Sequence, residues 1–207
     1  MKHYLDITLL PDAEANLGFL WQKVFQQVHI ALADNKVSER ESAVAISIVC
    51  YGDKNFPLGN KLRLFATNEE QLHKINVGKW LARLTDYCHI SSVKSVPSNV
   101  GQFACFRQKR IKGQGRLESQ LLRKAKHISE KFNVDYNKCL TELTTKPQFV
   151  ESTLPFIYVE SQETKKRLGS DGQSTFPMFI DRELSNQPVA GKFDCYGLSK
   201  TATVPWF

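Results

Sequence analysis

The amino-acid sequence predicts an α+β protein, with a ferredoxin-like N-terminal domain over residues 1–95 and a smaller C-terminal α+β domain over residues 96–207. Three observations favour this fold. Strand-like and helix-like apolar patterns follow one another in the order β-α-β-β-α-β over about the first 95 residues, which is the split βαβ plan. A basic amphipathic helix lies in the middle of the chain, and short apolar runs typical of strands return from Pro155 onward.

The N-terminal elements follow from hydrophobic periodicity. Residues 2–10 alternate as a strand does, and residues 17–33 place apolar side chains at helical spacing behind Asn16, which can cap a helix. Two strands joined by a hairpin loop, a second helix and one more strand are then expected, at residues 43–50, 61–67, 68–85 and 87–95. Many RNA-binding modules share this order, and so do many other proteins, so the order alone does not define a function.

The C-terminal half is expected to begin with a linker. Residues 96–115 contain turn-prone residues and end in a basic, glycine-bearing loop, although the apolar FACF within them could form a short strand. A helix over residues 116–132 and a short one near 135–143 follow. The runs PFIYVES, FPMFI and FDCYGL are then expected to form short strands, with a polar surface loop between the first two.

The composition narrows the class of protein. A hydrophobic fraction of 42% allows a buried core, and a formal net charge of +7 is typical of proteins that meet nucleic acid or an anionic membrane. The five cysteines include no C-x-x-C pair, which argues against a zinc knuckle and a disulfide framework. The sequence has neither a secretory segment nor an apolar run of about 18 residues. We therefore expect a cytoplasmic protein that makes no use of a membrane.

A basic strip runs through residues 107–131, where Glu118 and Glu130 are the only acidic residues. A solvated helix face would show a similar pattern. RNA binding is favoured because basic residues of the preceding loop continue onto the helix, and several neutralised phosphates supply much of the affinity for a polyanion. A helix can enter A-form RNA only where the major groove is widened, as at the end of a hairpin stem. The polar face of the helix carries Arg116, Ser119, Gln120, Arg123 and His127.

His29 is the candidate general base. It lies near the end of the helix over residues 17–33, one position off the apolar stripe, where a histidine more often serves packing. Its ordinary pKa of about 6.5 suits proton transfer near neutral pH. The sequence shows no cluster with metal-ligand spacing, so we expect neither a metal nor a cofactor. Without a metal ion, RNA is a better substrate for cleavage than DNA, because RNA carries its own nucleophile, the 2′-OH.

Several segments resemble one family of ribonucleases. The opening HYLDITLLPD, the helix KVFQQVHIAL, the runs PFIYVES and FPMFI, and above all the C-terminal CYGLSKTATVPWF resemble the CRISPR repeat-processing endoribonuclease of type I-F systems, the Csy-type Cas ribonuclease. The resemblance implies a protein that binds the hairpin of a CRISPR repeat and cuts at the 3′ base of the stem without metal. It also implies that the protein stays on the mature crRNA with other Cas subunits in an interference complex.

The resemblance also implies roles for single residues. His29 would act as the base on the 2′-OH, Ser161 would hold that hydroxyl, and Tyr196 would help to orient His29. Phe176 would stack under the terminal base pair, and Arg107 would read bases. The other RNA contacts expected from the strip are Lys109, Arg116, Ser119, Gln120, Arg123 and Lys124.

The sequence departs from the family pattern in two places. The loop between Ser161 and Phe176 is longer than usual, which leaves Ser170 and Ser174 as further candidates for the hydroxyl. Ser119 and Gln120 stand where the family favours arginine, so the cognate repeat sequence stays open. A second hypothesis also stays open, because a non-catalytic subunit that binds an RNA hairpin in a ribonucleoprotein would carry the same basic strip.

Overall fold

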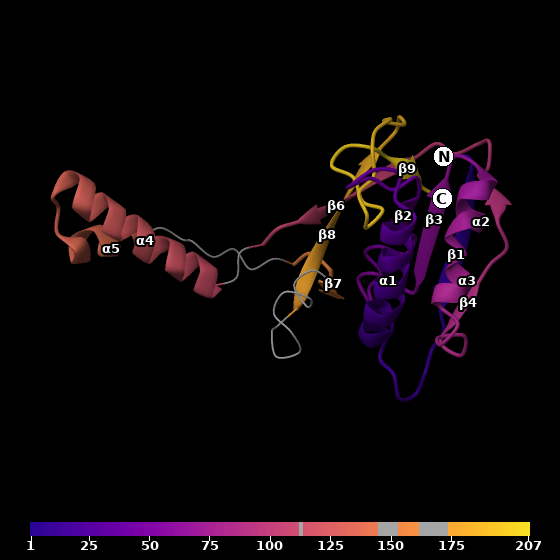
Figure 1. Ribbon diagram of the computed structural model, residues 1–207, viewed down its shortest axis with the longest axis horizontal. Coiled ribbons are helices and arrows are strands. Elements are labelled where there is room, and N and C mark those ends of the chain that lie inside the picture. The colour runs from indigo at the N-terminus through magenta and orange to yellow at the C-terminus, as the bar shows by residue number, and fades with distance from the viewer. Residues whose placement is uncertain (112–113, 145–152, 162–173) are drawn as a thin grey trace. The chain divides into compact units, whose positions relative to one another are not determined.

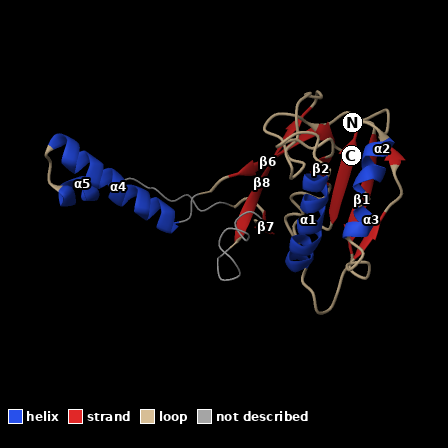
Figure 2. Cartoon of the chain, in the orientation of Figure 1, coloured by secondary structure: helices blue, strands red, loops and turns tan. Residues whose placement is uncertain are grey.

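The computed structural model describes four ranges of the chain, residues 1–111, 114–144, 153–161 and 174–207 (Figure 1). Of Gln114 and Arg116, the backbone alone is described. The protein is of mixed α+β class, with two antiparallel sheets and several helices (Figure 2). Two compact units are present, Met1–Lys109 together with Leu154–Phe207, and Arg110–Thr153. No helix in the described ranges is long and apolar enough to cross a membrane.

The first sheet belongs to the larger unit, and its strands follow the order β2-β3-β1-β4 with antiparallel pairing throughout. A further short strand, β5, also pairs with β1. Helices lie along one face of this sheet, with α1 next to α3 (Figure 2). The elements are β1 (His3–Leu9), α1 (Leu17–Asp34), β2 (Ala45–Ile48), β3 (Lys61–Ala66), α2 (Glu69–Ile75), α3 (Val77–Trp80), β4 (Cys88–Ile90) and β5 (Lys94–Ser95).

The helix α1 begins as the sequence predicts and fixes the core. The Asn16 side chain accepts a hydrogen bond from the backbone N–H of Phe19, which satisfies one of the free donors at the helix start. One face of α1 then packs on the sheet, and the indole N–H of Trp21 donates to the Gly59 carbonyl oxygen at 2.6 Å. The buried residues of the helix are Leu20, Trp21, Val24, Phe25, Val28, Ala31 and Leu32.

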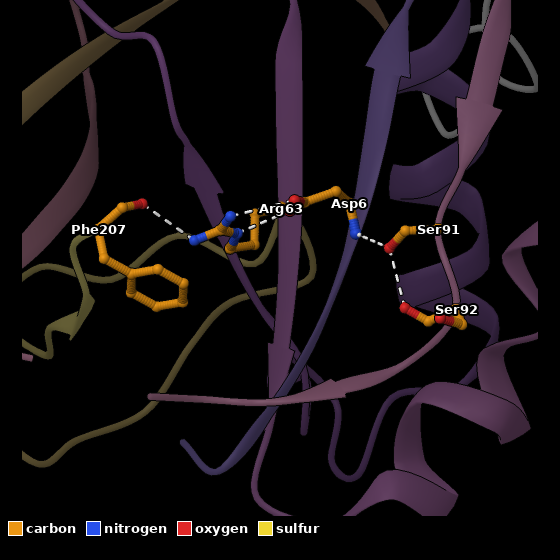
Figure 3. A network of polar contacts seen from close by, with 5 residues as sticks. All are labelled: Asp6, Arg63, Ser91, Ser92 and Phe207. Atoms are coloured by element: carbon orange, nitrogen blue, oxygen red, sulfur yellow. Dashed lines mark hydrogen bonds and ion pairs between the residues drawn. The ribbon is translucent and has the colours of Figure 1, made fainter. Parts of the chain in front are cut away.

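A buried ion pair lies on the first sheet (Figure 3). The Arg63 guanidinium donates to both carboxylate oxygens of Asp6, at 2.6 and 3.0 Å, and to the Phe207 carbonyl oxygen at 3.0 Å. The same guanidinium lies 4.3 Å from the Tyr4 ring centroid and 4.1 Å from that of Phe207. The pair with Asp6 is bidentate and charge-assisted, and the single hydrogen bond and ring contact of the same guanidinium hold Phe207 against the first sheet.

The second sheet also belongs to the larger unit and has the order β7-β8-β6-β9. It contacts the first part of the unit, because α1 packs against β7 and β2 against both β6 and β9. The larger compact unit thus includes residues from both sides of the expected boundary at 95/96, and the division into a ferredoxin-like domain over 1–95 and a C-terminal domain over 96–207 stays a prediction. The strands are β6 (Phe103–Lys109), β7 (Phe156–Glu160), β8 (Thr175–Ser185) and β9 (Val204–Pro205).

The structure corrects the expected linker over residues 96–115. The seven residues of β6 pair along their whole length with β8, in the register Arg107 opposite Asp181. Charge and glycine content suggested a loop because the partner strand was not visible in the sequence. Opposite charges at facing positions of an antiparallel pair stabilise the strand. Without its partner strand, the sequence of β6 has the pattern of a basic loop.

Three other elements differ from the expectation. The helix over residues 68–85 is interrupted at Asn76, whose left-handed φ of 46° ends α2. The strand near residues 87–95 is split into β4 and β5, because the Ser91 side chain takes the backbone N–H of Asp6 and interrupts the ladder. The run FDCYGL forms a turn and no strand, for reasons given with the candidate site.

The described residues of the smaller unit include two helices, α4 (Gln114–Phe132) and α5 (Tyr136–Thr144). Asn133 links them in the left-handed conformation, at a φ of 51°, and the Ser129 hydroxyl donates to the Val134 carbonyl oxygen. Ala125 and Cys139 are buried between the helices. The predicted basic helix is therefore confirmed as a helix.

Candidate active site

A tight turn near the C-terminus carries one side of the site. The Asp194 carboxylate accepts the backbone N–H groups of Tyr196 and Leu198, at 2.8 and 3.0 Å. Gly197 adopts a φ of 73°, and a Cβ atom there would lie 2.6 Å from Cγ2 of Ile46. The Gly197 carbonyl oxygen also accepts the N–H of Ile46, in β2. Only glycine fits this place, so the turn is held tightly against the first sheet.

His29 lies against this turn from the last part of α1. Its Nδ1 is 2.9 Å from the Cys195 carbonyl oxygen, and its ring stacks on Tyr196 with centroids 4.0 Å apart and planes 12° from parallel. A carbonyl oxygen can only accept a hydrogen bond, so Nδ1 must carry the proton. In the neutral ring Nε2 therefore holds the lone pair, and it is the atom that can accept a proton.

The surroundings keep His29 neutral near pH 7. Burial lowers the pKa of its imidazole below the ordinary value, because the charged ring loses its hydration. The hydrogen bond to Cys195 and the nearby charge of Asp194 act in the opposite direction but are weaker. Burial likewise raises the pKa of the Asp194 carboxyl, although the two backbone N–H groups favour its charged form. A neutral imidazole with a fixed tautomer has the protonation state that a general base needs.

Replacing Asp194 with asparagine is expected to move the pH dependence of any His29-dependent reaction to lower pH. The asparagine Oδ1 can still accept the two N–H groups of the turn, but the negative charge that raises the pKa of His29 is gone. The pKa of His29 then falls, so the ring is neutral, and the rate reaches its plateau, at lower pH. A pH–rate profile checks this, and a profile displaced to higher pH would contradict it.

The serines expected at the site lie next to a second contact of α1, made through Gln26. The Ser161 backbone N–H donates to the Ser174 carbonyl oxygen at 2.8 Å, directly after the end of β7 and directly before the start of β8. The Ser174 hydroxyl donates to the Glu160 carboxylate at 3.2 Å. The Gln26 side chain in turn pairs with the backbone of Glu160. The structure thus ties both serines to the helix that carries His29, while Ser170 lies outside the described residues.

The remaining expected contacts in the larger unit lie on β6 and β8. Phe176 is half-buried, faces Val159 across the β7–β8 pair and packs against the core. The Arg107 guanidinium is held by the carboxylates of Asp181 at 2.9 Å and Glu183 at 2.7 Å. Lys109 approaches Asp181 at 3.8 Å. Binding of an RNA phosphate or base by Arg107 would therefore have to replace existing ion pairs.

The expected contacts on α4 lie in the smaller unit. Arg123 and Lys124 are exposed, and within the described residues neither forms an ion pair. Gln120 is also exposed, whereas the Ser119 hydroxyl donates to the Gly115 carbonyl oxygen of its own helix at 2.8 Å. The Arg116 side chain lies outside the described part of the structure. The helix thus presents free cations, and Ser119 is engaged locally.

Two residues of the site were not singled out from the sequence, Gln26 and Asp194. The turn at Asp194 had a signal, because an aspartate three residues before a glycine is typical of a turn and argues against a strand. Gln26 had none, since its partner is the backbone of a residue far along the chain. Across the described ranges there is also no group of three or more His, Cys, Asp or Glu side chains that could hold a metal ion.

Comparison with known proteins shows the family of the chain. The chain matches the family described as CRISPR-associated protein (Cas_Csy4) over residues 4–207. Two relatives, from Escherichia coli (strain UTI89 / UPEC) and Pseudomonas aeruginosa (strain UCBPP-PA14), are each 29% identical over 208 residues and 100% of both chains. Both are named CRISPR-associated endonuclease Cas6/Csy4. A solved structure titled "Characterization of a Cas6-related gene from Pyrococcus furiosus" aligns over 99% of each chain at 10% identity, but its TM-score of 0.35 is too low to bear on the fold.

The fold and the site define a mixed α+β protein with a half-buried, tautomer-fixed histidine as its candidate base. Because the family match extends over nearly the whole chain, the protein belongs to the Cas_Csy4 family of CRISPR-associated proteins. The resemblance expected from the sequence is thereby confirmed at the level of the family.

Proposed function

We propose that the protein is an endoribonuclease that binds the hairpin of CRISPR repeats in precursor RNA and cleaves at the 3′ base of the stem. The observation that carries the proposal is the state of His29, whose Nδ1–H is committed to the Cys195 carbonyl oxygen and whose Nε2 is left as the basic atom. The family membership and the endonuclease names of both full-length relatives support the same activity.

The proposed reaction uses the nucleophile of the RNA itself. Nε2 of His29 accepts the proton of the 2′-OH on the nucleotide before the scissile phosphate. The resulting alkoxide attacks the phosphorus in line, the bond to the 5′ oxygen breaks, and that oxygen takes up a proton. The products are a 2′,3′-cyclic phosphate and a 5′-OH. Positioning and one base suffice for this step without a metal ion.

Other residues have supporting roles in this proposal. Tyr196 stacks on His29 and holds the plane of its ring. The hydroxyl of Ser161, or of Ser174 beside it, holds the 2′-OH. Phe176 provides the ring on which the terminal base pair stacks, a contact that contributes roughly 1–3 kcal/mol per base in other proteins. Binding of the stem rests on α4 and on Arg107 and Lys109 of β6.

The proposal extends to the architecture and the partners. The antiparallel order β2-β3-β1-β4 supports a ferredoxin-like arrangement of the first sheet with its helices. Membership of a CRISPR-associated family supports a cytoplasmic protein that remains on the mature crRNA with other Cas subunits of a type I-F complex. The exposed side chains of Arg123 and Lys124 on α4 support the RNA contact.

Replacing Arg116, Arg123 and Lys124 with alanine is expected to weaken hairpin binding and to flatten its salt dependence. Each lost phosphate contact lowers the slope of log K against log salt by about 0.7–0.9, because fewer counterions are released on binding. Filter-binding titrations at several salt concentrations measure the slope. Lys138→Ala, an exposed cation of the neighbouring α5, is the matched control, and a triple variant with the wild-type slope would refute the proposed interface.

A cleavage assay separates the endoribonuclease from the second hypothesis, a hairpin-binding subunit without activity. The protein is incubated with a labelled repeat hairpin in excess chelator, and the RNA products are resolved by size. One specific cut at the base of the stem, leaving a 2′,3′-cyclic phosphate, supports the enzyme. RNA that is bound and stays intact supports the binding subunit.

A further inference from the structure

The open edge of β7 is hydrogen-bonded by a side chain of α1, Gln26, which has no role in the proposed mechanism. β7 is the edge strand of the second sheet and pairs with β8 on one side only. The Pro155 carbonyl oxygen accepts the N–H of Ile180 in β8, and the Ser161 N–H donates to the carbonyl oxygen of Ser174, the residue directly before β8. Since the direction of backbone groups alternates along a strand, the N–H and C=O of Glu160 point to the other, open side.

The Gln26 side chain satisfies both of these groups. The Glu160 N–H donates to Oε1 of Gln26 at 2.8 Å, and Nε2 of Gln26 donates to the Glu160 carbonyl oxygen at 3.2 Å. One side-chain amide thus takes the place of one residue of a neighbouring strand. The contact is half-buried and joins residues 134 positions apart in sequence.

Gln26 and His29 are three positions apart on α1 and therefore lie on the same side of the helix. Through His29 this side is bonded to the turn at Cys195, and through Gln26 it is bonded to the residue directly before Ser161. The Ser174 hydroxyl, bonded to the Glu160 carboxylate, is attached to the same point. One helix face thus holds the base and the end of β7, next to which Ser161 and Ser174 lie.

We propose that Gln26 is a positioning residue, which sets the place of the serine hydroxyl relative to Nε2 of His29. This inference rests on the proposed function. Its physical basis is that an in-line attack requires the reacting groups within a few tenths of an ångström of their productive places, and that a misplacement of about 1 Å can cost about 100-fold in rate. RNA affinity does not depend on the contact, because the residues proposed to bind the stem lie on other elements.

The test measures single-turnover cleavage of a repeat hairpin by the full-length protein in excess, together with hairpin affinity and thermal stability. Gln26→Leu removes both hydrogen bonds, and Gln26→Asn keeps the amide but is too short to reach. Each is expected to cut roughly 10- to 100-fold more slowly, with affinity within about twofold of the wild type. Gln27→Leu is the matched control, since that side chain lines a hollow with Lys79 and Trp80 of α3.

A double-mutant cycle distinguishes positioning from general stability. If Gln26 acts through the serine, Gln26→Leu adds no further loss to Ser161→Ala or to Ser174→Ala, whichever supplies the hydroxyl. Losses that multiply in both backgrounds, or a Gln26→Asn protein that cuts at the wild-type rate, would overturn the inference while leaving the proposed function intact. A wild-type protein that binds the hairpin and leaves it uncut would remove the proposed function itself.

Discussion

Replacing His29 with alanine is expected to lower the single-turnover cleavage rate by roughly 10²–10⁴-fold, the usual contribution of a general base. Alanine removes Nε2, the atom that the Cys195 hydrogen bond leaves free to accept a proton. Hairpin affinity should change little, because the proposed RNA contacts lie on α4, β6 and β8. The measurement is a cleavage time course at saturating protein, with affinity measured on an uncleavable hairpin.

The pH dependence of the wild type provides a second check on His29. The rate should rise with pH through the pKa of His29 and then level off, because only the neutral ring accepts a proton. Burial lowers that pKa, so the rise should be centred below the ordinary value for histidine. His73→Ala, an exposed histidine paired with Glu69, should behave as the wild type. A His29→Ala protein that cuts at nearly the wild-type rate would contradict the assignment.

Replacing Arg63 with methionine is expected to lower the free energy of unfolding by about 3 kcal/mol, at the lower end of the range for breaking a buried ion pair. The side chains of Arg63 and Asp6 are 8% and 15% exposed, so the substitution leaves the Asp6 carboxylate largely buried without its partner. The contacts to the Phe207 carbonyl oxygen and to the Tyr4 and Phe207 rings are lost as well. Chemical denaturation of the full-length protein measures the change in the free energy of unfolding.

The double variant Arg63→Met, Asp6→Leu separates the lost pair from the lost packing. Removing both charges avoids an unpaired buried carboxylate, so part of the stability should return. Arg83→Met, at an exposed arginine of the same unit, should stay within about 0.5 kcal/mol of the wild type. An Arg63→Met protein as stable as the wild type would show that the network in Figure 3 does not stabilise the fold.

Local patterns predicted the elements that bury one apolar face. The helix from Leu17, its Asn16 cap and the strands β1, β2 and β3 follow directly from hydrophobic period and capping chemistry. Elements that depend on distant partners did not follow from such patterns. β6 carries Arg107 within a basic run and becomes a strand because Asp181 faces it on β8. The FDCYGL run was expected to form a strand, but it forms a turn because the Asp194 carboxylate accepts two backbone N–H groups within it.

The candidate site also contains residues that were expected from the sequence and residues that depend on distant partners. His29 and Tyr196 were expected together from the family resemblance, and the structure brings their rings to 4.0 Å. Sequence could not indicate the tautomer, because it depends on the Cys195 carbonyl oxygen 166 residues away. It could not indicate Gln26 either, since a side chain that pairs with the backbone of Glu160 leaves no residue-type pattern. The roles of Ser161, Phe176 and the basic residues in RNA binding stay predictions.

The central claim, attack by the 2′-OH of the RNA under general-base catalysis, is tested most directly by a hairpin with a single 2′-deoxyribose at the nucleotide before the scissile phosphate. The substitution removes the nucleophile and leaves the stem and its phosphates unchanged. Cleavage by the wild-type protein should stop, while hairpin affinity stays within about twofold because the phosphate contacts remain. Continued cutting of the deoxy hairpin at the same bond would contradict the mechanism.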